Sequence, residues 1–368
     1  MNILFTDYGF NNLGGAERAA RELILCLEDR GHRGRVFSAS IGGRRTVAPT
    51  AGVKVVWDLD DLDFVPDVIH AQSHLDAMLA ISSLPDVPAV FHCHGGGFSD
   101  TPPIHPRIYR YLAITETLAR RLAIESNLPP FRIEVILNWV DLTLFPVART
   151  PSPKPRKALV FGNNIRPNAI VDAVSQAVAG QGLELDRIGR RITREIDNPE
   201  EVLPNYDIVF ASGKSAMDSL ASGCAVIVLG QQGCGEMVRS DNFDRFRKAN
   251  FTIPVNSPPP SVERIVGEIE RYDAAEAAAV TQRLRRECGV DRAASRMEEI
   301  YGEVIAEHRE ARQEPAEALR ATGRYLRSLV PVAKLADDQS ETGDAGFWSS
   351  DSAAEALAAQ VAAIRRGE

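Results

Sequence analysis

The chain has 368 residues, of which 44% are apolar and 25% charged, a composition typical of a folded globular protein long enough for two domains. Its formal net charge of −8 argues against nucleic acid as the main partner, because phosphate backbones require a basic surface. No stretch approaches about eighteen apolar residues, so we expect no transmembrane span. The N-terminus leads directly into an apolar strand, and we therefore expect no signal peptide.

The five cysteines are scattered through the sequence and form no Cys-x-x-Cys pair. Two of them, Cys26 and Cys224, lie in apolar surroundings where reduced thiols are common. We therefore expect reduced, structural cysteines and a cytoplasmic protein.

The first half alternates short apolar strands with amphipathic helices. One helix is expected from Ala16 to Arg30, where apolar residues recur at helical spacing before Gly31, and another from Glu116 to Glu125. The expected strands are 2–6, 34–39, 53–57, 67–70, 88–92, 111–114 and 133–137.

Closely spaced prolines predict an extended linker over residues 148–156. Beyond it we expect helices at 167–179 and 215–222, and strands at 157–161, 183–188, 206–211 and 225–229. Such alternation predicts α/β structure: two Rossmann-like domains, 1–147 and 157–310, with parallel sheets facing a central cleft. Ligands of open parallel sheets bind at the carboxyl ends of the strands, which places the candidate sites at that cleft.

The end of the chain reads as helical from 261 to 309, followed by a helical or flexible tail over 311–368. In this tail Leu319, Leu326, Leu329 and Val330 share one helical face, and three arginines lie opposite. This basic amphipathic pattern fits either packing onto the protein, which we expect, or peripheral contact with a partner or the inner membrane face. The polar stretch 337–351 is expected to be flexible.

Two glycine-containing junctions between a strand and a helix are candidate ligand sites. Gly14-Gly15 follows the first strand, where it is either a plain tight turn or a place for a phosphate at a helix N-terminus. In the second half, Ser215 and Asp218 have the spacing of a capping box. The same geometry lets the amides of Gly213 and Ser215 hold a phosphate, while Lys214 adds charge and Asp218 accepts ribose hydroxyls.

Histidines follow two strands of the first half. His70 ends one strand, and His92 and His94 stand at the end of another, before Gly95 and Gly96. No carboxylate or cysteine lies at ligand spacing, so we expect no metal. His94 precedes an open glycine turn and is a candidate for hydrogen bonding to a substrate hydroxyl or a phosphate, with a purely structural role as the alternative.

Two further groups follow strands of the second half. Asn163, Asn164 and Arg166 offer amides and a cation for a diphosphate, or form a solvated loop. Gly235 and Glu236 offer an open backbone and a carboxylate for sugar hydroxyls, or form a simple turn.

In their order along residues 1–310, these segments resemble GT-B glycosyltransferases, and most closely the retaining, nucleotide-sugar-dependent enzymes of family 4. The segments that carry the resemblance are Gly-Gly-Ala-Glu-Arg at 14–18, Asp-Val-Ile-His-Ala at 67–71, His94-Gly95, Ala-Ile-Thr-Glu at 113–116, Val-Ile-Leu-Asn at 135–138, Val140-Asp141 and Asp-Ser-Leu-Ala-Ser-Gly at 218–223.

The resemblance implies a hexosyltransferase-type enzyme that needs neither metal nor cofactor and serves polysaccharide or glycoconjugate synthesis. Its donor is a nucleoside-diphosphate sugar, and its acceptor a glycan, a lipid-linked sugar or a small molecule. Gly14 and Gly15 would lie near the donor phosphates, with Asp218 in place of the family's ribose-binding glutamate. His94, Lys214 and Arg166 would act in catalysis.

The resemblance also implies the remaining site residues. The donor side would include Asn163, Asn164, Gly213, Ser215, Gly235 and Glu236, and the acceptor side His70, Gly95 and Gly96.

The sequence departs from the family pattern in two places. Phe210 stands eight positions before Asp218, where the family has a second glutamate, and the usual Arg and Lys pair is reduced to Asn163, Asn164 and Arg166. A catalytically degenerate GT-B module that acts as a partner or scaffold in glycan assembly is therefore the alternative. A GT-B epimerase is less favoured, since the expected acid and base carboxylates are missing.

Overall fold

The computed structural model describes residues 1–7, 10, 14–39, 52–230, 233–253, 260–312 and 314–342, the last eleven by backbone only. The chain forms two compact units, and both are discontinuous in sequence. Unit 1 comprises Met1–Asn12, Ile24–Ile136 and Ala294–Glu368, and unit 2 comprises Leu13–Leu23 and Leu137–Ala293. The sequence-based boundaries at 147, 157 and 310 follow chain order and differ from these, because helices α1 (Gly15–Asp29) and α10 (Val290–Glu310) contribute to both units.

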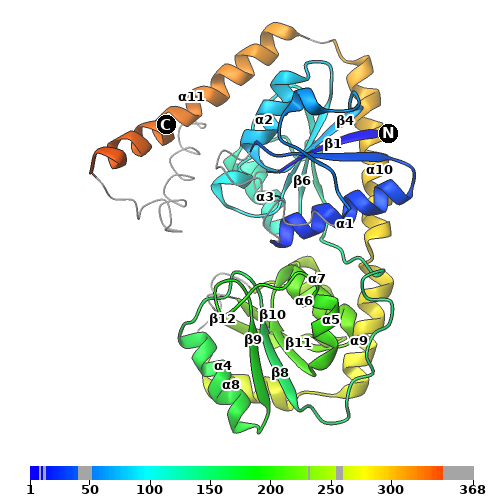
Figure 1. The fold of residues 1–368 in the computed structure, drawn as a ribbon, viewed down its shortest axis with the longest axis vertical. Helices are drawn as coiled ribbons and strands as arrows, with labels where there is room; N and C mark the ends of the chain where they lie inside the picture. Colours follow the sequence, from blue (N-terminus) through cyan, green and yellow to red (C-terminus); the bar gives the residue numbers. More distant parts are fainter. Residues whose placement is uncertain are drawn as a thin grey trace. The chain divides into compact units, whose positions relative to one another are not determined.

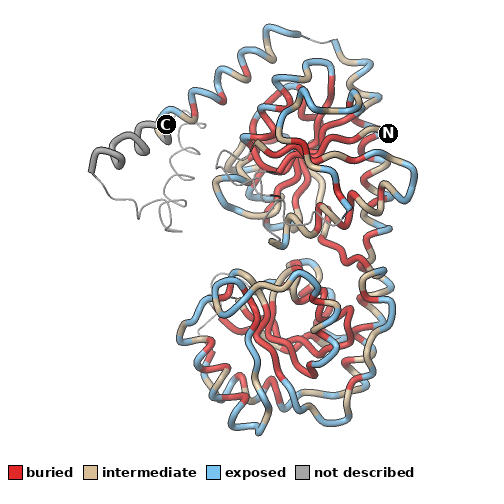
Figure 2. The backbone as a smooth tube through the Cα atoms, in the orientation of Figure 1, coloured by how far each residue is buried: buried red, intermediate tan, exposed pale blue. Residues whose placement is uncertain are grey.

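Unit 1 contains a parallel sheet of seven strands in the order β3-β2-β1-β4-β5-β6-β7 (Figure 1). Every strand expected in the first half is present. The strands are β1 (Asn2–Thr6), β2 (Arg33–Phe37), β3 (Val55–Val56), β4 (Val68–Ala71), β5 (Ala89–Cys93), β6 (Ile108–Ala113) and β7 (Ile133–Val135). Every residue of β4 and β5 is buried, as expected for parallel strands covered on both faces, and Figure 2 shows this burial along the strands.

Helices α1, α2 (His74–Ser83), α3 (Glu116–Glu125), α10 and α11 (Pro315–Thr342) contribute to unit 1, with short helical turns η1 (Leu59–Asp61), η2 (Phe98–Asp100) and η3 (Pro130–Arg132). Helix α3 begins as expected, because the side chain of Thr115 accepts a hydrogen bond from the Leu118 amide. Helix α2 was not expected. Its apolar residues surround it, with Ile81 buried and Leu79 exposed, so no single stripe marked it as a helix.

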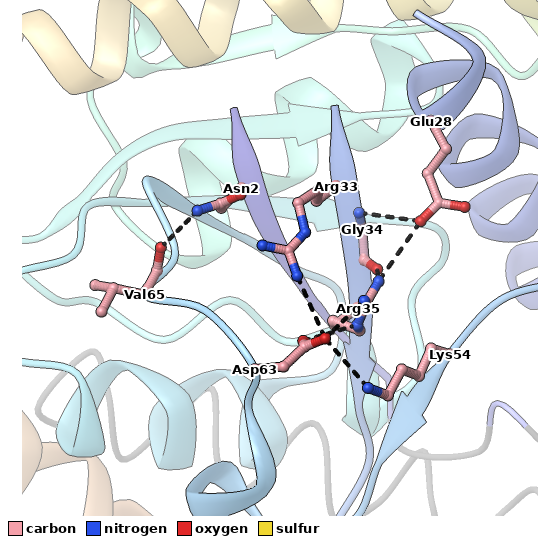
Figure 3. Close-up of polar contacts among 8 residues, drawn as sticks. All are labelled: Asn2, Glu28, Arg33, Gly34, Arg35, Lys54, Asp63 and Val65. Atoms are coloured by element: carbon pink, nitrogen blue, oxygen red, sulfur yellow. Dashed lines mark hydrogen bonds and ion pairs between the residues drawn. The ribbon is translucent and has the colours of Figure 1, made fainter. Parts of the chain in front are cut away.

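A polar network at the surface of unit 1 connects β2 to the segment after η1 (Figure 3). Asp63 accepts from Arg33, Arg35 and Lys54 at 3.0 to 3.3 Å. Hydrogen bonding from Arg35, the largest cause, holds the pKa of the Asp63 carboxyl well below its usual range. Asp63, together with Glu28 beside Arg35, offsets part of the positive charge of these three cations.

Unit 2 contains a sheet in the order β12-β11-β10-β8-β9 (Figure 1). Its strands pair in parallel, except that β12 pairs with β11 antiparallel. The four expected strands are present. The bounds are β8 (Lys157–Phe161), β9 (Glu184–Ile188), β10 (Ile208–Ala211), β11 (Ala225–Gly230) and β12 (Gly233–Met237). The helices wholly within unit 2 are α4 (Ala169–Gly180), α5 (Pro199–Val202), α6 (Gly213–Ser222), α7 (Phe243–Lys248), α8 (Val262–Glu270) and α9 (Ala274–Glu287), with η4 (Leu203–Asn205).

The proline-rich segment 148–156 has no helix or strand and packs against unit 2. Arg149 donates its amide to Ser222 O at 2.9 Å, and its guanidinium lies 2.7 Å from Asp207. Tyr272 donates to Ser152 O at 2.8 Å. The linker is therefore held on its own unit along much of its length.

The tail helix α11 packs onto unit 1 with a face other than the leucine face. Ala321, Tyr325 and Ser328 are buried, whereas Leu319 and Leu326 are 74% and 57% exposed. The tail thus packs onto the protein as expected, but small and hydroxyl-bearing side chains make that contact and the leucines do not. Residues 337–342, expected to be flexible, are helical, and 343–351 lie outside the described residues. No described helix is long and apolar enough to cross a membrane.

Candidate functional site

The best-built cluster of polar side chains lies in unit 2, where helix α6 begins after β10. Gly213 has φ +58°, in the left-handed region that favours glycine, and its amide donates to Phe251 O at 3.0 Å. The residue before it, Ser212, is the N-cap of α6. The expected capping box of Ser215 and Asp218 was wrong, since both residues lie inside the helix, and Ser215 O accepts from Ser219 Oγ.

Four charged side chains from α1 and α6 form an alternating chain of ion pairs in unit 2. Arg18 Nη2 lies 2.8 Å from Asp218 Oδ2, and Asp218 Oδ1 lies 2.5 Å from Lys214 Nζ. Lys214 Nζ lies 2.7 Å from Glu22 Oε1. The side chains of Lys214, Asp218 and Glu22 are at most 5% exposed. We call these four residues the charge quartet. Its formal charges sum to zero when all four are ionised.

Burial shifts the pKa values of Glu22 and Arg18 in the quartet. It is the main reason that the pKa of Glu22 rises to about 7; the adjacent Asp218 adds to the rise, and Lys214 and Arg18 oppose it. Burial also opposes the charge on Arg18, but Asp218, Glu22 and Glu200 outweigh it and raise the pKa of the guanidinium. Glu22 therefore changes its charge near neutral pH.

The first glycine junction meets the second within unit 2. A Cβ built on Gly15 would lie 3.5 Å from Lys214 Cβ, so the start of α1 touches the first turn of α6. Two bonds fix α1 there: Trp139 Nε1 donates to Ala19 O at 3.1 Å, and the amide of Asp141 donates to Glu22 Oε2 at 3.2 Å. Gly14 lies under the carboxylate end of the Glu17 side chain, which would have to move to admit a Cβ there.

Sequence reasoning missed Arg18 and Glu22. Both follow Gly14-Gly15 on α1, and Glu22 stands next to Leu23 of the buried apolar stripe. A carboxylate at a buried helical position requires a cation nearby, and that signal was available in the sequence.

The loop after β8 contains the predicted residues Asn163, Asn164 and Arg166. Asn163 Nδ2 donates to Glu195 Oε1, and Asn163 Oδ1 accepts from the backbone amide of Arg190 at 3.1 Å. Asn164 and Arg166 are exposed. Arg190, which sequence reasoning missed, follows the end of β9 and pairs with Glu195 at 3.0 Å.

Gly235 and Glu236 lie in the edge strand β12, so the expected open turn was wrong. A Cβ on Gly235 would come 2.9 Å from Ile253 Cγ2, and close packing in the sheet accounts for this glycine. Glu236 lies 2.8 Å from Arg245, which, as the main cause, lowers the pKa of the carboxyl.

Three histidines of unit 1, His70, His92 and His94, form a row that runs into the interior. Tyr301 Oη lies 2.6 Å from His70 Nδ1, and His70 Nε2 lies 3.3 Å from His92 Nδ1. The rings of His92 and His94 are 4.3 Å apart. His70 is 1% exposed, and burial, reinforced by His94, lowers its pKa to about 3. The structure thus places His70 in the interior rather than on an accessible acceptor surface, because β4 is covered on both faces.

His94 lies at the boundary between this row and the glycine turn. It is half-buried, and burial lowers its pKa to about 4, so the ring is neutral at physiological pH. No described residue hydrogen-bonds its Nε2. The unpaired nitrogen of a neutral imidazole can form one hydrogen bond with a hydroxyl group.

Asp100 and Arg121 shape the glycine turn. The Asp100 carboxylate accepts from the His94 amide at 3.4 Å, and burial raises its pKa to about 6 against the opposing effects of that bond and of Arg121. A Cβ on Gly95 would come 3.1 Å from Asp100 Oδ2. At Gly96 a Cβ would overlap the Arg121 guanidinium. A larger residue at either position would therefore displace the end of one of these side chains.

Among the described residues, no group of three or more His, Cys, Asp or Glu side chains is arranged to hold a metal ion. The five cysteines are free thiols, and four of them are buried.

Comparisons with known proteins define the fold family. Residues 58–144 match the model of Glycosyltransferase Family 4. No curated protein matches the chain significantly. A glycosyltransferase from Rickettsia africae ESF-5 is similar in structure, with a TM-score of 0.57 and 14% identity over 83% of this chain and 98% of that chain.

Two further solved structures are similar. HepE from Anabaena, solved with UDP and glucose, has a TM-score of 0.56 and 13% identity, over 82% of this chain and 100% of that chain. Sucrose-phosphate synthase from Thermosynechococcus elongatus has a TM-score of 0.54 and 12% identity, over 83% of this chain and 99% of that chain. The expected fold class is confirmed: the chain has the GT-B fold of glycosyltransferases, and its residues 58–144 relate it to glycosyltransferase family 4.

Proposed function

We propose that the chain is a retaining glycosyltransferase of the hexosyltransferase type that transfers a sugar from a nucleoside diphosphate to a glycan, a lipid-linked sugar or a small acceptor. The observation that carries this proposal is the contact of Gly15 with the first turn of α6, where Lys214 and Arg18 supply two cations beside a helix N-terminus. A GT-B fold with HepE, solved with UDP and glucose, among its structural neighbours supports a nucleotide-sugar donor.

In this proposal the donor diphosphate is held near Gly14 and Gly15 and by the amide of Ser215, while Gly213, whose own amide donates to Phe251 O, forms the left-handed turn beside it. Oriented amides and cations favour the charge that develops on a departing diphosphate, and the reaction then needs no metal. Lys214 is the main cation. Protonation of Glu22 below pH about 7 leaves Lys214 with one carboxylate partner instead of two.

The remaining predicted site residues keep their proposed roles. Arg166, Asn163 and Asn164 would contact the diphosphate from the loop after β8, and Asp218 the ribose. Gly235 and Glu236 would lie on the donor side.

His94 would act near the transferred sugar, and because its Nε2 is buried, a hydrogen bond from it to a sugar hydroxyl would require the glycine turn to open. Gly95 and Gly96 would lie beside the acceptor. The buried position of His70 suits an indirect contribution through His92.

A thermal-shift screen against UDP, GDP, ADP, CMP and dTDP sugars tests the donor, because a ligand that binds only the folded state raises its apparent stability. We expect one nucleotide series to raise the melting temperature, and calorimetry to show weaker binding of it by Lys214→Met. Lys157→Met, at the opposite end of β8, serves as the control and should bind normally. Equal affinity of wild type and Lys214→Met would contradict the role of Lys214.

Turnover of the identified donor tests the sugar side of the proposal. His94→Ala should lower turnover much more than it lowers thermal stability, because its Nε2 makes no hydrogen bond to the described residues. His308→Gln, on α10, is the matched control. A loss of turnover that merely parallels a loss of folded protein would make His94 structural.

The closed pairing of the charge quartet favours a second candidate, a degenerate GT-B module in glycan assembly. Lys214 and Asp218 are buried and partnered by other protein side chains, and Phe210 stands where the family has a glutamate. Failure of every nucleotide sugar to shift the melting temperature or be consumed would select this candidate over the enzyme.

A further inference from the structure

The outward side of α11 carries an apolar stripe that the fold of unit 1 leaves uncovered. Leu319, Leu326 and Val330 recur at spacings of seven and four residues and are 74%, 57% and 48% exposed. The opposite side of the helix is fixed to unit 1. There, Tyr325 Oη lies 2.7 Å from His74 Nδ1, and Ala321 is fully buried. In Figure 2 buried positions alternate with exposed ones along this helix.

Further exposed apolar side chains belong to the elements that hold α11. Leu75 and Leu79 are exposed on α2, whose first residue, His74, bonds Tyr325. Ile104 is exposed next to His105, which interacts with the Ala318 carbonyl of α11. Exposed apolar side chains thus occur on two segments that each contact α11, in addition to the stripe on α11 itself.

Charge identifies the partner. Within α11 the four cations all lie in the stretch 318–336, which contains no Asp or Glu, whereas the four carboxylates of the helix lie at its two ends, at Glu317, Asp337, Asp338 and Glu341. At helical spacing, Arg320, Arg324 and Arg327 fall along one flank of the apolar stripe; the side opposite the stripe, where they were expected, is the buried side of the helix. Glu317 pairs with the first two at 3.0 and 2.8 Å, and Arg327 has no ion-pair partner among the described residues. An apolar stripe flanked by arginines is complementary to the surface of a lipid bilayer that has anionic headgroups above an apolar acyl-chain layer.

We propose that the outer face of α11 docks the protein on an anionic lipid bilayer. In that arrangement Leu319, Leu326 and Val330 enter the boundary between headgroups and acyl chains, and the arginine flank contacts lipid phosphates. The opposite face keeps its contacts with unit 1, so docking requires no unfolding of α11. This proposal does not depend on the enzymatic proposal above.

Co-sedimentation of the full chain with phosphatidylcholine vesicles, with and without phosphatidylglycerol, tests the docking surface. We expect pelleting only with the anionic vesicles, and weaker pelleting at high salt because screening acts on exposed charges. Leu319→Asp with Leu326→Asp should lower the partition coefficient about tenfold or more. Arg327→Gln should lower it about fivefold, the value for one surface cation.

Ile124→Asp, on α3, is the matched control, since Ile124 is 77% exposed in the same unit and lies outside the stripe. It should pellet like wild type, and circular dichroism should show all variants folded. Equal pelleting of wild type and the double aspartate variant would overturn the proposal. So would absent pelleting combined with a dimer in solution that the double variant abolishes, because a second copy would then cover the stripe.

Discussion

Replacing Glu22 by Gln tests the buried charge quartet through the pH dependence of stability. Glu22 is buried between Lys214 and the amide of Asp141, and its pKa is raised from 4.5 to about 7. An acid with a raised pKa binds its proton more tightly in the folded state than in the unfolded chain. The resulting stability is fully present below pH 4.5 and is lost as the pH rises through 7.

The size of this effect follows from the two pKa values. The interval from 4.5 to about 7 corresponds to about 3 kcal/mol, at about 1.36 kcal/mol per pKa unit. Gln cannot ionise but keeps an oxygen for the Asp141 amide. The free energy of unfolding of Glu22→Gln minus that of wild type should therefore increase by about 3 kcal/mol from acidic to mildly alkaline pH.

Urea unfolding at a series of pH values, followed by tryptophan fluorescence, measures this difference. Trp139 is a suitable probe because its indole bonds Ala19 O on the same helix as Glu22. Taking a difference between two proteins cancels the contribution of other groups, such as the histidines with lowered pKa values. Glu116→Gln, at an exposed position on α3, should show no such trend. A difference for Glu22→Gln that stays flat or falls with rising pH would refute the buried-acid interpretation.

Three further substitutions test local features by chemical denaturation. Gly213→Ala should destabilise the protein by about 1–2 kcal/mol, because φ is +58° there; unchanged stability would mean that the turn has another geometry. Gly267→Ala, within the exposed part of α8 where an added Cβ meets nothing, should instead stabilise by about 0.5–1 kcal/mol, and a loss would contradict this. Tyr325→Phe should cost about 1 kcal/mol and speed amide exchange in α11, since its hydroxyl bonds His74; protected amides would show that other contacts hold the helix.

The central strands of both sheets, such as β4, β5, β10 and β11, were predictable because they are buried on both faces and appear as continuous apolar runs. Other elements were not, and two of them have a clear reason. Helix α2 is apolar around its circumference, and β12 has the sequence Gly-Cys-Gly-Glu, which locally resembles a turn. Only pairing with β11 makes it a strand. That pairing is a tertiary effect that no local pattern contains.

The sequence allowed us to predict where the candidate site lies, but not which side chains pair with one another in it. The junctions at Gly15 and Gly213 could be located because each follows a parallel strand at its carboxyl end. Pairing of Lys214 with Glu22 depends on how the start of α1 packs against α6, and charge spacing along one helix does not reveal it. Similarly, strand alternation predicts that His70 lies at the end of β4, but it does not predict that both faces of this strand are covered by other elements.

The discontinuous make-up of the two units bears on how this protein folds during its synthesis. The sheet of unit 1 is translated by residue 135, yet Tyr301, the hydrogen-bond partner of its buried His70, arrives only after nearly all of unit 2 has been made. Conversely, Arg18 and Glu22 leave the ribosome long before Lys214 and Asp218 exist to pair with them. Neither unit can therefore reach its final core as an early, separate step. A chain cut at the proline-rich segment would yield two fragments, each with charged or polar groups buried next to missing partners.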